Sequence, residues 1–101
     1  MVDMSDIQNV WVFNGSRSRF PSSVFSSKAL ADTWITKNRL SGVLTRYPLD
    51  MSAYDWAVSR GLFTPSKEEH HEPDFIGKFT TASQEHYHYE DGIESGLPAG
   101  G

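Results

Sequence analysis

The chain contains no cysteine, which excludes a disulfide framework, a thiolate zinc site and a cysteine nucleophile. It also has no stretch near the roughly 18 apolar residues that a membrane-spanning helix needs. The acidic start "MVDMSDIQNV" lacks the apolar core of a secretory signal. The absence of disulfides fits a reducing compartment. We therefore expect a cytoplasmic protein without a membrane partner.

Positive charge is scarce in the last third of the chain. Residues 67–101 hold two lysines against eight acidic residues, whereas residues 1–66 hold seven Lys/Arg against five Asp/Glu, and the formal net charge is −4. Such an acidic segment would repel phosphates, so we expect no nucleic-acid binding. It suits a basic protein partner. A merely solvated acidic surface is the alternative.

The length of 101 residues predicts a single domain. With 38% hydrophobic residues and 13% aromatic residues, the chain can build one core, and it has little room for a deep active site as well. The composition of the two ends predicts a disordered N-terminus over residues 1–9 and a flexible, Gly/Pro-rich tail over residues 93–101. The ordered domain is then expected to cover residues 10–92.

Hydrophobic periodicity predicts an α+β fold in the order β-β-α-β-α-β-β, with a mainly antiparallel sheet and two helices packed on one face. The first helix is expected to begin after a Ser26 or Ser27 cap and to bury Leu30, Ala31, Trp34 and Ile35. Gly42 is expected to end it. A polar, mobile loop is expected between Pro65 and Pro73. The predicted strands cover residues 10–13, 20–25, 43–49, 74–80 and 85–90, and the predicted second helix lies within residues 51–61.

The segment "SQEHYHYEDG" is the most chemically dense part of the chain. In a strand with period two, Tyr87 and Tyr89 share one face with Glu85, while His86, His88 and Glu90 share the other. We expect the tyrosines to pack in the core and the histidines to face solvent. The segments 74–80 and 85–90 read as a hairpin, which would place Lys78 beside the histidines.

Two interpretations of this exposed face remain open. His86 and His88 share a face and Glu90 adds a carboxylate, so these three residues are a candidate metal site. The pattern H-x-H is short and often occurs by chance, so a partner-binding surface is the favoured interpretation. The candidate partner-binding residues are Glu68, Glu69, Glu85, His86, His88, Glu90 and Asp91.

Known catalytic signatures are missing from the sequence. "NGSRSR" has a single glycine and reads as a turn rather than a phosphate-binding loop. No serine stands in a G-x-S-x-G context. No catalytic residue and no cofactor is therefore predicted.

Three motifs, "SGVLTRYPLD", "YDWA" and "ASQEHYHYEDG", carry a resemblance to a group of small bacterial proteins with no assigned chemistry. The resemblance runs from about Val10 to Gly92. In size and acidity the chain is similar to immunity proteins of bacterial competition systems, such as contact-dependent growth inhibition. Those proteins bind and neutralise a cognate toxin domain, often a nuclease.

The resemblance implies a non-enzymatic protein that blocks the active site or substrate groove of a basic cognate toxin, as a monomer or homodimer. One alternative is a metal-binding domain or metal-dependent enzyme that uses His86 and His88. Another is an intracellular, self-associating regulatory module.

Overall fold

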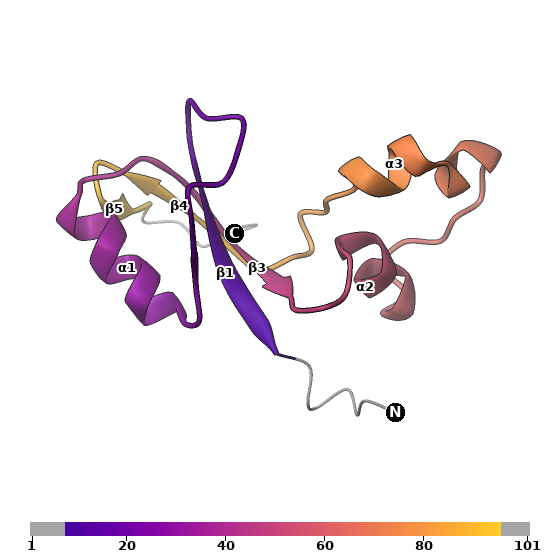
Figure 1. The fold of residues 1–101 in the computed structure, drawn as a ribbon, viewed down its shortest axis with the longest axis horizontal. Coiled ribbons are helices and arrows are strands. Elements are labelled where there is room, and N and C mark those ends of the chain that lie inside the picture. The colour runs from indigo at the N-terminus through magenta and orange to yellow at the C-terminus, as the bar shows by residue number, and fades with distance from the viewer. Residues whose placement is uncertain (1–7, 96–101) are drawn as a thin grey trace.

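The computed structural model describes residues 8–95 and shows an α+β domain built on an antiparallel sheet (Figure 1). The predicted fold class is confirmed. Within the described residues the five strands lie in the order β2-β1-β3-β4-β5, and every neighbouring pair is antiparallel. The elements in chain order are β1 (Asn9–Gly15), β2 (Ser23–Phe25), α1 (Lys28–Lys37), β3 (Gly42–Pro48), α2 (Ala53–Ser59), the 3₁₀ helix η2 (Glu68–His71), α3 (Pro73–Lys78), β4 (His86–Glu90) and β5 (Ile93–Glu94).

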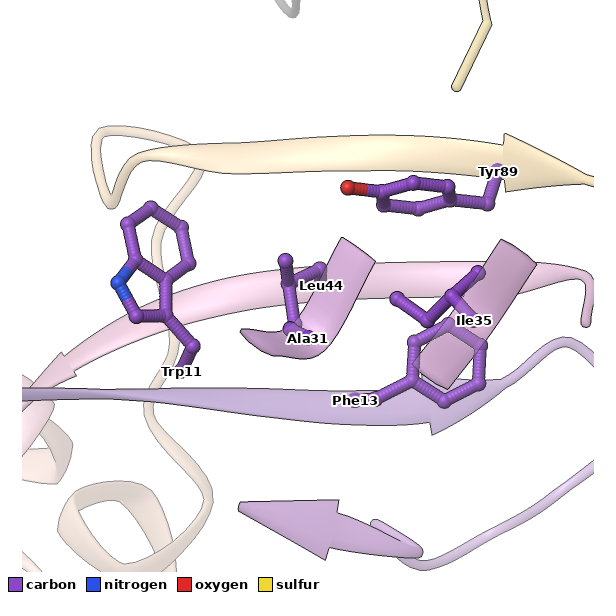
Figure 2. Packing of buried hydrophobic residues seen from close by; sticks show 6 residues of the cluster. All are labelled: Trp11, Phe13, Ala31, Ile35, Leu44 and Tyr89. Carbon is purple, nitrogen blue, oxygen red and sulfur yellow. The ribbon is translucent and has the colours of Figure 1, made fainter. Parts of the chain in front are cut away.

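The main core lies between α1 and one face of the sheet (Figure 2). Alternate residues of the strands point to this face because the side-chain period of a strand is two. The register brings these residues side by side across the sheet, and α1 covers them with two small or branched side chains. The buried members of the cluster are Trp11, Phe13, Ala31, Ile35, Leu44 and Tyr89.

Helix α1 begins as the sequence predicts. The Ser27 side chain accepts a hydrogen bond from the backbone N–H of Leu30 at 3.2 Å, which satisfies one of the unpaired donors of the first turn. Ala31 and Ile35 are fully buried, but Leu30 is 56% exposed and does not join the predicted stripe. The helix ends at Lys37 rather than running on toward Gly42, which instead opens β3.

The predicted strand over residues 74–80 is wrong, because residues 74–78 belong to helix α3 and no strand forms in this segment. Pro73 occupies the first turn and Asp74 adds a negative charge there, and both favour a helix start. The predicted hairpin with residues 85–90 is therefore absent. Strand β4 instead pairs with β3 and β5, and Lys78 lies in α3 rather than on the sheet face.

Helices α2 and α3, with η2 between them, form a second packed unit that we call the distal lobe (residues 53–79). Figure 1 shows α2 and α3 beyond the end of the strands, away from α1. The expected packing of a second helix over the sheet face is thus not found. The segment predicted as a mobile loop contains η2. The aromatic rings that contact one another in this lobe are Tyr54, Phe63, His70, Phe75 and Phe79.

The ends of the domain extend slightly past the predicted limits. Asn9, assigned to the disordered start, is the first residue of β1, and Ile93 and Glu94, assigned to the tail, form β5. Residues 1–7 and 96–101 lie outside the described residues, and with them the rest of both predicted ends. Among residues 8–95, no helix has the length and apolar character that a membrane crossing requires.

Candidate partner-binding face

The sheet face opposite α1, which we call the outer face, carries the predicted histidine site. The pairing register places its residues in rows that cross the sheet, such as Val24–Val12–Thr45–His86. None of the residues on this face is buried, whereas the opposite face holds the main core. The outer-face residues are Val10, Val12, Asn14, Val24, Val43, Thr45, Tyr47, His86, His88, Glu90 and Ile93.

The structure bears out the two faces expected for "HYHYE". Tyr89 is 5% exposed in the core, and Tyr87 packs against the core from the same side. His88 and Glu90 are exposed on the outer face, and His86 is half-buried there. The period of two therefore assigned each of these side chains to its side of the sheet.

The two outer-face histidines lie against each other. Their ring centroids are 5.4 Å apart with nearly perpendicular planes. Nδ1 of His86 lies 2.7 Å from the carbonyl oxygen of Gln84, and since a carbonyl only accepts, this nitrogen donates. Across residues 8–95 no group of three or more His, Asp or Glu side chains is placed to hold a metal ion, so His86, His88 and Glu90 do not form one.

The other predicted partner-binding residues are divided among separate places. Glu85 directly precedes β4, where it pairs with Arg46 at 3.2 Å and accepts a hydrogen bond from the Tyr87 hydroxyl. Asp91 lies in the turn between β4 and β5, and its N–H donates to the Ser41 hydroxyl at 3.0 Å. Glu68 and Glu69 are exposed in η2, within the distal lobe. The structure therefore brings together only His86, His88 and Glu90.

A hollow of about 530 Å³ opens on the outer face above the start of β3. It follows from the register, because the small residues Ser41 and Val43 lie between Ser16 on one side and the longer His88 and Glu90 on the other. The sequence does not predict this hollow, because the hollow depends on which strands become neighbours. Its lining residues are Ser16, Ser41, Gly42, Val43, His88, Tyr89, Glu90 and Ser95.

A polar seam joins α1 to β4 and β5 on the opposite side of the sheet. The Lys28 ammonium contacts Glu94 at 2.8 Å and Asp32 at 3.1 Å, and it lies 4.4 Å from the centre of the Tyr87 ring. The Tyr89 hydroxyl donates to Asp32. Lys28 and Asp32 are four residues apart, a spacing that favours an ion pair on a helix, so this part of the seam can be predicted from the sequence. The seam contributes packing and charge pairing and does not form an open site.

The seam shifts the proton affinities of its members. Partial burial alone would lower the pKa of Lys28, but the hydrogen bonds to Glu94 and Asp32 outweigh it and raise that pKa. Burial, followed by the hydrogen bond to Asp32, raises the pKa of Tyr89. The hydrogen bond to Glu85, followed by burial, raises the pKa of Tyr87. All three groups therefore keep their protons to higher pH than they do in an unfolded chain.

The model of a family described as "Domain of unknown function (DUF7710)" matches residues 10–95. No curated protein and no solved structure matches the chain.

Proposed function

The chain belongs to the DUF7710 family, and we propose that it is a non-enzymatic protein that binds a partner protein through the outer face. The observation that carries the proposal is the contrast between the two sides of one sheet. One side is covered by α1, while among residues 8–95 the other carries valines and aromatic side chains that no helix covers. Val24 is 62% exposed and Ile93 is 70% exposed on this face. An apolar face rimmed by polar residues is typical of an interaction surface.

The edges of the sheet favour contact through the face rather than through strand addition. The edge strands β2 and β5 contain three and two residues. Short edge strands offer few unpaired backbone groups, which is how proteins discourage edge-to-edge pairing. A partner is therefore expected to pack on the outer face.

The dimensions of the outer face also indicate that its surroundings take part. Among residues 8–95 the five strands contain 7, 3, 7, 5 and 2 residues, 24 in all. At a rise of about 3.3 Å per residue and a strand spacing of about 4.8 Å they cover roughly 380 Å² in projection, about half of what one partner buries in a standard interface. The rim of the face includes Asp91 and the exposed loop over residues 16–22. We infer that a partner covers the face together with part of this rim.

The proposed partner is a basic cognate toxin, and the chain acts as its immunity protein in the cytoplasm. Glu90 and Asp91 give the end of β4 negative charge, and Glu68 and Glu69 give it to the distal lobe. Exposed carboxylates on an inhibitor steer a basic toxin toward the complex, and the apolar face slows its release. A nuclease toxin, which is built to bind phosphates, has the matching charge.

The test co-expresses the chain with the product of the gene immediately upstream and measures co-elution and protection of the host from growth arrest. Two outer-face variants, Val24→Lys and His88→Lys, place a positive charge against a basic partner and are expected to abolish both. Leu62→Lys, which changes a 49% exposed side chain in the distal lobe, is the matched control and is expected to retain both. Failure of the unmodified chain to co-elute or protect would refute the immunity proposal.

A further inference from the structure

We propose that the hollow on the outer face is a receptor for one basic side chain, an arginine or a lysine, projecting from the partner. This inference rests on the proposed function, because it takes the outer face as the binding surface. It adds the chemistry by which the partner is recognised. The residues that carry it are Glu90, His88, Ser16, Ser41 and Ser95.

The charge of the hollow points to a cation. Glu90 is the one carboxylate in its lining, and it forms none of the ion pairs found among residues 8–95. Two other acidic residues near β4 and β5 are engaged, since Glu85 pairs with Arg46 and Glu94 pairs with Lys28, and Asp91 in the turn does not line the hollow. Glu90 therefore keeps its full capacity to accept hydrogen bonds from a cationic group.

The remaining lining supplies the secondary contacts that a guanidinium or ammonium group needs. Ser16, Ser41 and Ser95 bring three hydroxyls that can accept hydrogen bonds, and the exposed imidazole of His88 offers a planar surface. The N–H of Ser95 donates a hydrogen bond to the carbonyl of His88 at 2.7 Å. The N–H of Ser16 donates one to the carbonyl of Ser41 at 3.0 Å. The walls of the hollow are therefore fixed by strand pairing.

Arg17 and Arg19 belong to the neighbouring loop, but neither lines the hollow. Both are exposed, so solvent screens their charge. They are expected to face carboxylates at the edge of a partner rather than the hollow itself.

The experiment uses the full chain and a defined probe. Nα-acetyl-arginine amide is titrated into isotope-labelled protein while backbone amide shifts are recorded by NMR, and Nα-acetyl-citrulline amide serves as the neutral, nearly isosteric control. We expect saturable shifts at Ser16, Val43, His88 and Ser95, and at least about fivefold weaker binding of the citrulline compound, because charge-assisted hydrogen bonds are roughly twice as strong as neutral ones.

Glu90→Gln is expected to bring the ratio of the two affinities close to one. Glu69→Gln, which removes the same charge from an exposed position in η2, is expected to leave it unchanged. Equal binding of both compounds, or arginine shifts spread over the distal lobe, would overturn the inference. Such a result would leave the outer-face proposal standing if Val24→Lys and His88→Lys still abolish capture of the toxin, so the two failures are distinguishable.

Discussion

At the scale of single residues, His70 organises the distal lobe although the sequence placed it in a mobile loop. Its ring centroid lies 5.1 Å from that of Phe63 and 4.8 Å from that of Phe75. Its Nδ1 accepts the backbone N–H groups of Ser66 at 3.1 Å and Lys67 at 3.2 Å. One imidazole thus fills an aromatic gap and caps the turn that leads into η2.

His70→Ala is therefore expected to lower the free energy of unfolding by about 1–3 kcal/mol, through lost packing and two lost hydrogen bonds. His70→Asn keeps an acceptor near the position of Nδ1 and is expected to recover part of the loss. His71→Ala changes the adjacent, exposed histidine and is the control, with an expected effect within about 0.5 kcal/mol. Urea denaturation measures all three, and equal effects at the two histidines would contradict the assignment.

Tyr89 gives the protein a defined response to alkaline pH. Burial and the hydrogen bond to Asp32 raise the pKa of its hydroxyl, so the folded chain retains a proton that the unfolded chain releases above a pH of about 10. Because the folded state then binds more protons, stability falls as pH rises, by up to about 1.4 kcal/mol per pH unit for this group. The raised pKa of Lys28 acts in the same direction, since its stabilising charge is present below a pH of about 10.4 and is lost above it.

Tyr89→Phe is expected to be less stable than the unmodified protein at neutral pH, because it loses the hydrogen bond to Asp32, and the two curves of unfolding free energy against pH are expected to converge between pH 9 and about 11. Denaturant unfolding at a series of pH values provides the curves. Parallel curves across this range would show that the Tyr89 proton does not contribute.

At the scale of elements, alanine substitutions at Gly92 and Gly77 are expected to change the stability of the domain in opposite directions. Asp91 and Gly92 both have positive φ, of 51° and 82°, and join β4 to β5 in a two-residue hairpin turn. A Cβ on Gly92 would lie 2.9 Å from the Cα of Arg39 and 3.1 Å from the carbonyl oxygens of Ile35 and Thr36. This turn therefore packs directly on the end of α1.

Gly92→Ala is expected to destabilise the domain by about 2–4 kcal/mol, through the backbone conformation and the contact with α1. Gly77→Ala is the matched control in α3, where a Cβ would meet nothing within 4 Å. It is expected to stabilise the chain by about 0.5–1 kcal/mol, because alanine is the better helix former. Thermal unfolding of both variants checks the signs, and equal losses would contradict the account of the turn.

The elements that the sequence predicts well are those whose pattern fits a single period. The strands around Trp11 and Leu44 and the helix capped by Ser27 are of this kind. The segment over residues 74–80 fits two periods at once. Phe75 and Phe79 share a face either in a strand or, four residues apart, in a helix, and both rings contact Tyr54. Pro73 at the start of this segment favours the helix, because proline is common in the first turn of helices.

The candidate site was predictable to the same extent. The period of two placed His86, His88 and Glu90 on one face, since that depends on β4 alone. The hollow forms because β3 lies beside β4. The sequence analysis paired β4 with residues 74–80 instead, so it could not predict the hollow. The Asp-Gly turn that creates β5 is a recognisable hairpin signal, although the tail was expected to begin there.

At the scale of the whole molecule, the short edge strands of the sheet indicate a monomer. Edge strands of three and two residues disfavour pairing between copies, and a net charge of −4 adds mutual repulsion. Light scattering is expected to give the monomer mass from about 10 μM to 1 mM at moderate salt. A dimer that Val24→Lys dissociates would show instead that the outer face binds a second copy.

The two aromatic clusters predict that the distal lobe opens before the sheet unfolds. The main core contains residues from β1, α1, β3 and β4, and the rings of the lobe form a separate group. Neither η2 nor α3 has a buried residue. Segments with few buried contacts open locally at a lower free energy than the global transition. The segment that leads from the distal lobe back to β4 is tied to β3 by Gln84, which is 2% exposed. The Gln84 side chain accepts a hydrogen bond from the N–H of Thr81 and donates one to the carbonyl of Arg46.

Hydrogen exchange measures this order of opening directly. Amides of residues 68–79 are expected to exchange at least about tenfold faster than those of β1 and β3, because their opening does not require the main core to separate. Gln84→Ala removes the tie to β3 and is expected to widen this difference, whereas Ser83→Ala, at the exposed neighbouring position, is expected to leave it unchanged. Equal protection of lobe and sheet in the unmodified protein would mean that the two clusters unfold as one unit. A wider difference in Gln84→Ala would instead show that one buried amide couples a loosely held lobe to the rigid sheet that presents the outer face.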